Sequence, residues 1–314
     1  MAELLVAVAV GAMLLLMAAL MLLSANAAWT AQVDGAAIDD SGRFALDIIG
    51  SAARQAAFVD WEVALPPAAG TATAAALDAC CLPPAVIGRD ARSLTRTSAG
   101  IDGVLADTVN GSDILAVRFG GARGGGVVDC AGFGVDVNDD GWSIFHVARN
   151  AAGVGELRCK YRGASGWGSD AIVEGVDTFQ VLYGLDLDEP ADGVPNEFVS
   201  ASIIEARDAT LALAGADAAA RQRDLLRRSH WKRVAAVRIA LLLHGAGAAS
   251  PRAPAVFDLF GAPYSTRFGS ADLGVHIDEA PMAPLLRWRE RRLFTATFAL
   301  RNATPGATDS ASAP

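Results

Sequence analysis

Lysine is almost absent from this sequence: of 26 basic residues, only Lys160 and Lys232 are lysines. The net charge is −9, and no stretch combines clustered basic side chains with aromatic ones. A protein that binds nucleic acid needs positive charge to replace the counterions of the phosphates, so we expect no nucleic-acid partner. With 19% charged residues, the chain is also not a disordered polyelectrolyte.

Histidine and cysteine are scarce too, with four residues of each. The histidines match neither an H-E-x-x-H motif nor the spacing of a catalytic triad, and no C-x-x-C motif occurs. We therefore predict that the protein is not an enzyme, has no catalytic residues and holds no zinc. Each histidine is interpreted as a surface residue or a hydrogen-bonded core residue: His146, His230, His244 and His276.

Charge is also nearly missing from the N-terminus, where residues 1–28 contain one charged side chain, that of Glu3. Leu4–Leu23 is an uninterrupted apolar run, and as a helix it would span roughly the 30 Å hydrocarbon core of a bilayer. A cleaved secretory signal has a basic start and a shorter apolar stretch of about 7–15 residues. The run therefore predicts a membrane-anchoring helix.

The helical pattern continues beyond the apolar run. Apolar and small residues recur at i/i+4 spacing through residues 29–60, with the charged side chains on other faces. We predict a single helix to about Phe58, apolar all round over residues 1–28 and amphipathic over residues 29–60. Pro66-Pro67 would close this segment.

After Pro67 the sequence changes to short β-type runs between turns rich in Gly, Asn and Asp. The expected strands are Ile114–Phe119, Trp142–Val147, Glu156–Tyr161, Ile172–Glu174, Phe179–Tyr183, Val234–Leu243 and Leu293–Arg301. Val234–Leu243 is apolar nearly throughout, as in a strand buried on both faces. Ala209–Arg228 is expected to be a helix or a mobile insertion, and the glycines of residues 120–126 a loose hairpin turn.

These patterns predict an α+β fold, in which the second half of the long helix packs on an antiparallel sheet domain of residues 61–303. Residues 304–314 are small and polar, which is typical of a flexible tail.

The N-terminus resembles the type IV pilin signature, in which Glu3-Leu4-Leu5-Val6-Ala7 opens the apolar helix. Later blocks are similar to the PilW family of minor pilins: Ser41–Ile49, Gly111–Arg118, Phe179–Gly184, Val234–Leu243 and Arg291–Phe294 with Ala299–Asn302. The N-terminal signature is shared by all pilins and by type II secretion pseudopilins, so the later blocks carry the resemblance to PilW.

The resemblance implies a minor pilin that takes part in type IV pilus assembly, in a priming or tip complex, and supports motility and adhesion. Its helix would cross the inner membrane once and contact lipid before assembly, with the sheet domain in the periplasm. In the pilus tip, the helix would contact other minor pilins and the major pilin. The alternatives are a J-type pseudopilin of type II secretion and a membrane-anchored periplasmic binding protein.

Glu3 has an implied role of its own. In the family, the acidic residue at this position pairs with the N-terminal amine of a neighbouring subunit during assembly; the alternative is an interfacial acid without a partner. The family's leader and its cleavage-site glycine do not precede Glu3 here, since Met1 stands two residues before it. Either the true start of translation lies upstream, which we expect, or this copy cannot be processed by prepilin peptidase.

The resemblance also implies a disulfide between Cys130 and Cys159, since the family has one Cys shortly before this strand region and another after it. A disulfide fits an oxidising compartment. Cys80 and Cys81 are adjacent, so either one of them pairs elsewhere or both stay reduced.

Two acidic turns are candidate calcium sites. Asp136, Asn138 and Asp140 follow the D-x-N-x-D-G spacing of a calcium loop, but Val147 stands where the closing Glu is needed. The second turn follows Gly184 and contains Asp186, Asp188 and Asp192. The alternative, which we favour for both, is a solvated Asx-type turn without metal. No other cofactor is expected.

Overall fold

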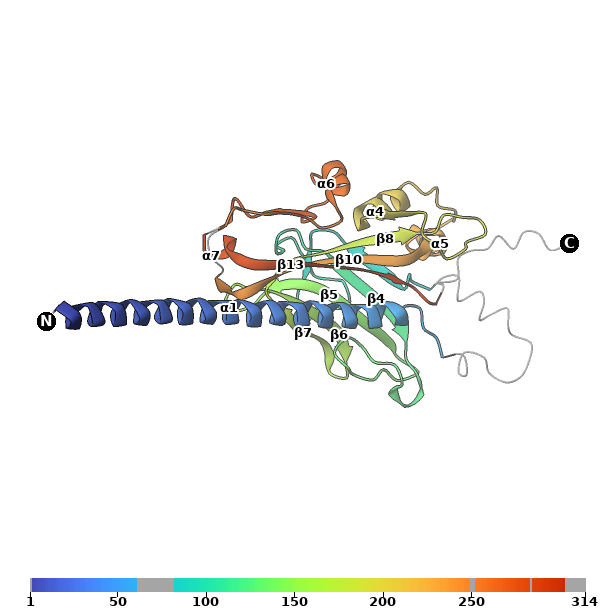
Figure 1. Cartoon of the computed structure of the whole chain (residues 1–314). Helices are drawn as coiled ribbons and strands as arrows, with labels where there is room; N and C mark the ends of the chain where they lie inside the picture. The colour runs from blue at the N-terminus through green and yellow to red at the C-terminus, as the bar shows by residue number, and fades with distance from the viewer. Residues whose placement is uncertain (1, 61–81, 249–251, 283, 303–314) are drawn as a thin grey trace.

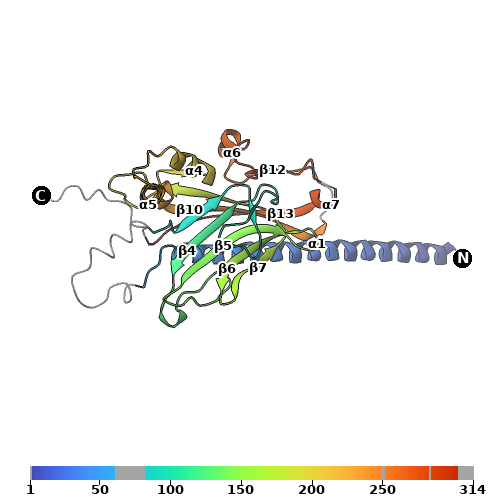
Figure 2. The same cartoon turned by 180° about the vertical axis from the view of Figure 1, so that it is seen from behind.

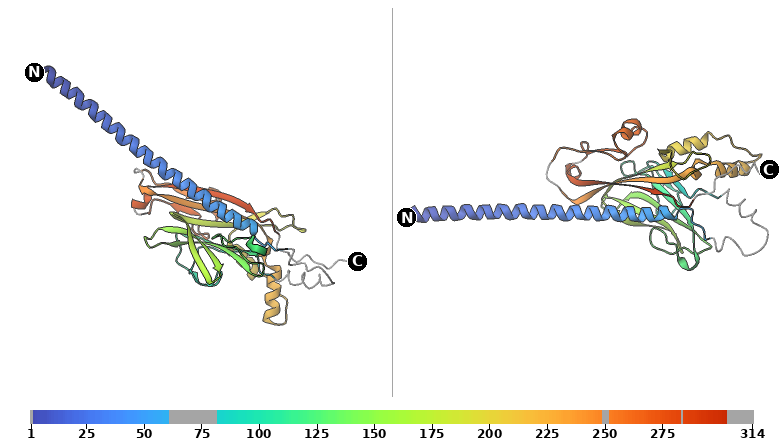
Figure 3. Two further views of the ribbon diagram at one scale, coloured as in Figure 1. Left: turned by 90° about the horizontal axis from the view of Figure 1, so that it is seen from below. Right: turned by 45° about the vertical axis from the view of Figure 1, so that its right-hand side comes forward.

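The computed structural model describes residues 2–60, 82–248, 252–282 and 284–302. The helix α1 (Ala2–Gln55) extends far beyond a β-rich body over its first half and lies along that body over its second half (Figures 1 and 3). The body contains two larger antiparallel sheets. The predicted α+β, pilin-like fold is therefore confirmed. Met1, Pro66-Pro67, Cys80, Cys81 and the tail 304–314 lie outside the described residues.

The first sheet has five strands in the order β1-β4-β5-β6-β7, and its central strands cross in front of α1 when the molecule is seen from behind (Figure 2). The strands are β1 (Val86–Arg89), β4 (Ile114–Gly120), β5 (Asp140–Arg149), β6 (Gly155–Gly163) and β7 (Gly166–Glu174). Asn150 builds the turn between β5 and β6, because its side-chain oxygen accepts hydrogen bonds from the backbone N–H groups of Ala152 and Val154.

The second sheet has the order β13-β10-β8-β9. Its strands are β8 (Val176–Leu185), β9 (Glu197–Val199), β10 (Val234–Ala248) and β13 (Arg289–Ala299). One face of β10 joins the main core through residues such as Ile239 and Leu241. The other face, with Ala240 and Leu242, is covered by the segment that contains Leu259 and Ile277. The prediction of a strand buried on both faces is confirmed for residues 234–243.

Smaller elements surround the sheets. They are the strand pairs β2 (Ser93–Leu94) with β3 (Val104–Leu105) and β11 (Val256–Asp258) with β12 (His276–Asp278), the helices α4 (Ala201–Ala209), α5 (Ala218–Arg228), α6 (Ala262–Phe268) and α7 (Pro284–Arg287), and the 3-10 turns η1 (Arg123–Gly125) and η2 (His230–Arg233). We call residues 252–282, which leave β10 and return before β13, the C-terminal excursion.

The segment Ala209–Arg228, predicted as a helix or a mobile insertion, is helical only in its second part. The segment holds only the end of α4 and the whole of α5, with an irregular stretch between them. Asp217 starts α5, since its side chain accepts a hydrogen bond from the N–H of Ala220.

The glycines of residues 120–126 do not form a simple hairpin turn. Instead, β4 and β5 are joined by a loop that contains η1 and a bridge between Val128 and Gly134.

All seven expected strands exist, with shifted ends. The largest shift concerns Ile172–Glu174, which is only the end of the nine-residue β7. The start of β7 is partly exposed and contains glycine, serine and aspartate, so its hydropathy pattern does not indicate a strand. The short strand β1 was missed, although Val86 is fully buried in the core.

The second half of α1 packs on β10 and β13, as predicted, and a row of glycines lets it approach closely. Gly35, Gly42 and Gly50 face Arg292, Phe294 and Phe298 of β13 in turn. Between them, Ile38, Ala45 and Ile49 are buried in the main core. The spacing of seven and eight residues places all three glycines on one helix face.

Helix α1 ends at Gln55, three residues before the predicted end. Ala57 has a positive φ of 57°, which turns the chain out of the helix. The chain then pairs with β4: the N–H of Ala57 donates to the carbonyl of Arg118, and the N–H of Gly120 donates to that of Phe58. These bonds tie the C-terminal end of α1 to the first sheet.

Candidate functional site

The first half of α1 presents an apolar surface that the rest of the described chain leaves uncovered. Its most apolar 18-residue window has a mean hydropathy of 2.8 and contains no buried residue. Leu15 and Met21, for example, are 73% and 76% exposed. Within the described ranges, α1 is the one helix long and apolar enough to cross a membrane. Such a surface requires lipid or another protein as its environment.

Glu3 lies in the first turn of α1 and is exposed. A carboxylate is favoured at the N-terminal end of a helix, where the backbone N–H groups carry partial positive charge. Within the part of the chain that the structure describes, Glu3 forms no hydrogen bond or ion pair. The assembly role of Glu3 stays a prediction.

The turn with Asp136, Asn138 and Asp140 is held by protein contacts. One side-chain oxygen of Asp136 accepts hydrogen bonds from the backbone N–H and the side-chain amide of Asn138, which is an Asx-type turn. Asp140 begins β5 and binds the Arg118 guanidinium of β4 through both carboxylate oxygens, at 3.0 and 2.9 Å. Calcium binding at this turn stays a prediction.

The turn after β8 brings its three aspartates together. One side-chain oxygen from each of Asp186, Asp188 and Asp192 lies within 4.8 Å of the other two. Asp186 is buried and accepts hydrogen bonds from the N–H groups of Asp188 and Gly193, whereas the other two aspartates are exposed. Because backbone groups already satisfy Asp186, the arrangement fits a metal-free turn as well as calcium, and calcium binding here also stays a prediction.

The implied disulfide is present: Cys130 and Cys159 are bonded to each other, with their Cα atoms 5.8 Å apart. Cys130 lies in the long loop between β4 and β5, and Cys159 lies in β6 beside β5. The bridge therefore ties this loop to the middle of the five-stranded sheet.

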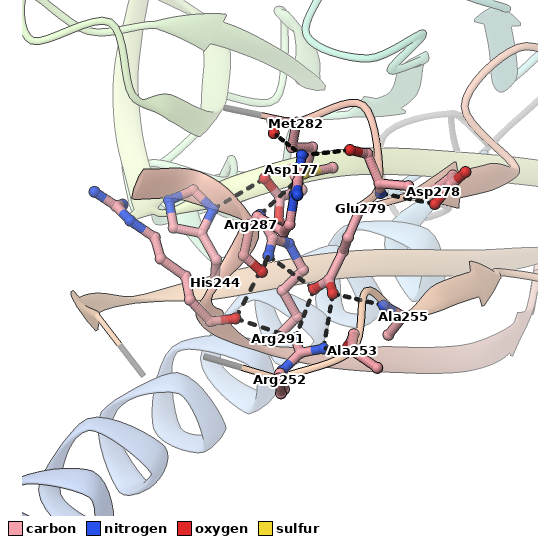
Figure 4. Close-up of polar contacts among 12 residues, drawn as sticks. Asp177, His244, Arg252, Ala253, Ala255, Asp278, Glu279, Met282, Arg287 and Arg291 are labelled. Atoms are coloured by element: carbon pink, nitrogen blue, oxygen red, sulfur yellow. Dashed lines mark hydrogen bonds and ion pairs between the residues drawn. The ribbon is translucent and has the colours of Figure 1, made fainter. Parts of the chain in front are cut away.

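A buried ion-pair cluster anchors the C-terminal excursion to the second sheet (Figure 4). Arg291 of β13 is fully buried and donates to Asp177 of β8 at 2.7 Å and to Glu279 at 2.9 Å. His244 of β10 contacts the other oxygen of Asp177 at 3.0 Å, and Arg252 donates to both oxygens of Glu279. Every charge in this cluster has a partner of the opposite sign.

The charges of this cluster set the pKa of Glu279. Burial alone would raise it, but the hydrogen bonds from Arg252 and the N–H of Ala255, with the charges of Arg252 and Arg291, lower the pKa of this carboxyl. The cluster could not be predicted from the sequence, because its members are distant in the chain and follow no motif. The cluster is structural in character, since its opposite charges pair with one another.

The histidines lack the geometry of hydrolytic catalysis. His146 is buried between Ser93 and Ser169 and contacts no carboxylate. Burial and the nearby positive charges of Lys160 and Arg158 lower its pKa to about 3, so it is neutral. The other three histidines contact aspartates: Asp208 for His230, Asp177 for His244 and Asp258 for His276. Within the described ranges, no histidine contacts both a hydroxyl and a carboxylate.

An uncovered apolar helix joined to a disulfide-bonded sheet domain defines a pilin-like protein with a single N-terminal membrane-anchor candidate. The model of the PilW family, described as Type IV Pilus-assembly protein W, matches residues 144–302, from β5 to the end of β13. This is half of the chain, and the protein belongs to the PilW family. No curated protein and no solved structure gives a significant match.

The family assignment confirms the resemblance drawn from the sequence and supports a part in type IV pilus assembly. PilW is a family of assembly proteins rather than enzymes, which agrees with the prediction that this protein is not an enzyme. Pilus assembly also implies contact with other pilus components.

Proposed function

We propose that this protein is a minor pilin that helps to start or cap a type IV pilus, in a complex with other minor pilins and the major pilin. The observation that carries the proposal is the uncovered apolar half of α1 in a chain of the PilW family. Pilus-dependent twitching motility and adhesion would follow from this assembly role.

The helix has two environments in this proposal. Before assembly, Leu4–Leu23 crosses the inner membrane and the sheet domain lies in the periplasm. During assembly, the same apolar surface leaves the lipid and packs against the helices of neighbouring subunits. Both environments are apolar, so the transfer exposes little apolar surface to water and costs little free energy.

Glu3 sets the position of the subunit in this proposal. Its carboxylate pairs with the N-terminal amine of a neighbouring subunit. An unpaired carboxylate drawn into an apolar helix bundle is costly, about 2.5–3.5 kcal/mol on insertion scales. Pairing therefore favours one axial register over others.

The test is an in-frame deletion of the gene, with surface pili counted by electron microscopy and twitching measured in parallel. We expect few or no pili and loss of twitching, both restored by the wild-type gene. Normal piliation would contradict the proposal. If the deletion blocked protein secretion instead and left the pili intact, the protein would act as a J-type pseudopilin.

The Glu3 variants refine this test. Glu3→Lys is expected to insert into the inner membrane but to fail in restoring pili, whereas Glu3→Asp keeps the charge and restores them. Membrane fractionation checks that both variants are present at the wild-type level. If Glu3→Lys entered the pilus normally, the proposed role of Glu3 would be refuted.

A further inference from the structure

Three carboxylates from distant parts of the chain meet at the border between the two sheets and the C-terminal excursion. Asp90 follows β1, Asp113 precedes β4, and Asp272 lies between α6 and β12. One oxygen from each lies within 4.8 Å of the other two. Asp113 is 2% and Asp272 is 5% exposed, and Asp90 is half-buried.

No positive side chain balances these carboxylates. Across the part of the chain that the structure describes, none of the three forms an ion pair with arginine, lysine or histidine, in contrast to Asp177 and Glu279 of the ion-pair cluster. Carboxylates placed this way repel one another when they are ionised, and a cation between them removes this repulsion.

A second observation points to a missing ligand. Oδ1 of Asp272 is buried and has no hydrogen-bond partner within the described ranges, and the carboxylate to which it belongs contributes one oxygen to the cluster with Asp90 and Asp113. A buried polar atom without a partner costs about 1–3 kcal/mol, so such atoms are rare in folded proteins. A bound cation would satisfy this oxygen.

The surrounding groups hold the three carboxylates in place. Asp113 accepts hydrogen bonds from the N–H groups of Ala91 and Val181, each at 2.9 Å. The hydroxyl of Tyr264 donates to Oδ2 of Asp272 at 2.8 Å, so within the described ranges Oδ1 is the oxygen of this carboxylate that has no partner.

Asp90 is fixed in the same way, at 2.9 and 2.7 Å from the N–H groups of Ala201 and Ser202 at the start of α4. Outer hydrogen bonds of this kind orient the ligands of metal sites.

The loop that carries Asp272 lies very close to the turn before β4. A Cβ on Gly274, which has φ of 93°, would lie 2.5 Å from the carbonyl oxygen of Asn110, and a Cβ on Gly111 would lie 2.6 Å from the backbone of Leu273. Only glycine at both positions allows this approach. The two glycines thus bring Asp272 to Asp113.

We propose that Asp90, Asp113 and Asp272 bind one calcium ion, which joins the C-terminal excursion to the two sheets. Three carboxylates are hard oxygen ligands, which suit calcium and magnesium rather than zinc or copper. Calcium is favoured over magnesium because it accepts irregular coordination and loses its water more readily. The site is distinct from both acidic turns predicted from the sequence.

The test is isothermal titration calorimetry of the full-length protein in detergent, freed of metal with chelator and titrated with calcium chloride. We expect one site with a dissociation constant on the order of 10⁻⁴ M, as in extracellular calcium modules. At about 100 times this constant, calcium should raise Tm by roughly 5–10 °C relative to chelator. Magnesium at the same concentration should have a much smaller effect.

Matched variants locate the site. Asp272→Asn keeps the shape of the side chain and the acceptor for Tyr264, and it should weaken calcium binding at least about tenfold while circular dichroism shows a folded protein. Asp188→Asn makes the same change in the exposed turn and should bind like the wild type. Tyr264→Phe removes the outer hydrogen bond of Asp272 but keeps all three carboxylates, so it should bind calcium more weakly than the wild type without losing the site.

Three results would overturn the proposal. They are a wild-type protein without calcium heat or a calcium-dependent Tm, Asp272→Asn binding as tightly as the wild type, and loss of binding in Asp188→Asn but not in Asp272→Asn. An equal response to magnesium would overturn the assignment to calcium. None of these results depends on pilus assembly, so the proposed function is tested separately.

Discussion

Phe294 of β13 occupies the space that a side chain at position 42 of α1 would need: a Cβ on Gly42 would lie 2.4 Å from its ring. The helix and the sheet therefore touch at this point without a helix side chain between them. Gly35 and Gly50 repeat the arrangement against Arg292 and Phe298. The direction of the projecting apolar half of α1 depends on this contact.

The first prediction concerns Gly42. Gly42→Leu should lower the free energy of unfolding by about 1–3 kcal/mol, because the new side chain must displace the ring of Phe294 or the helix itself. Denaturant unfolding of the full-length protein in detergent measures this. Gly11→Leu is the matched control on the same helix, since a Cβ on Gly11 meets nothing within 4 Å.

A double variant tests the specific contact. Phe294→Ala makes room at position 42, so Gly42→Leu should cost less in that background than in the wild type. If Gly42→Leu lowers the free energy of unfolding equally in both backgrounds, or no more than Gly11→Leu does, then α1 and β13 do not approach each other as closely as the structure indicates.

The second prediction concerns the disulfide. Replacing Cys130 and Cys159 together by serine should destabilise the domain by about 3–4 kcal/mol, because the bridge closes a loop of 29 residues and restricts the unfolded chain. For a domain of this size, Tm should fall by roughly 7–14 °C. Thermal unfolding followed by circular dichroism, without reductant, gives the comparison. A double variant with the Tm of the wild type would show that the bridge contributes nothing.

The long helix, its apolar first half and the doubly buried β10 could be predicted from the sequence, because each follows from a local pattern of hydropathy. The close contact of α1 with β13 could also have been predicted from the sequence. Gly35, Gly42 and Gly50 recur at spacings of seven and eight residues in a segment that otherwise favours a helix. Glycine is costly in a helix, by about 1 kcal/mol relative to alanine, so its regular recurrence indicates a packing reason.

The buried polar clusters could not be predicted. Asp90, Asp113 and Asp272 come from three separate elements, and only the tertiary fold brings them together. The acidic turns at 136–140 and 186–192 were visible because their residues are close in sequence. A sequence pattern therefore finds local sites and misses those assembled from a distance.

The third prediction concerns pH. His146 has a pKa of about 3 in the folded state against about 6.5 when unfolded, so below pH 6.5 the unfolded chain binds a proton that the folded chain does not. Its contribution to stability is present above pH 6.5 and falls by up to about 1.4 kcal/mol per pH unit between pH 6.5 and 3. Burial causes most of this lowering of the pKa, and the charges of Lys160 and Arg158 add to it. The groups that contact the imidazole ring are the hydroxyls of Ser93 and Ser169.

His146→Gln removes this titration. Urea unfolding at pH 7.5, 6.0 and 5.0 should show a smaller loss of stability in His146→Gln than in the wild type over this range. Acids with lowered pKa values, such as Glu279, lose their contribution only below about pH 4.5 and act equally in both proteins. Parallel pH profiles for the two proteins would contradict the neutral, buried state of His146.

The last prediction compares two arginines of the ion-pair cluster. Arg291 is fully buried and binds both Asp177 and Glu279, whereas the side chain of Arg252 is 36% exposed and pairs with Glu279 alone. Arg291→Met leaves two buried carboxylates without their shared partner and should cost about 3–5 kcal/mol. Arg252→Met should cost about 1 kcal/mol or less, because Arg252 is partly exposed and because Arg291 and the N–H of Ala255 still bind Glu279. Denaturant midpoints of the two variants, in the same detergent, give the difference. Equal costs would mean that the excursion is not held by the buried arginine, and its attachment would then depend on the apolar contacts of Leu259 and Ile277 with β10.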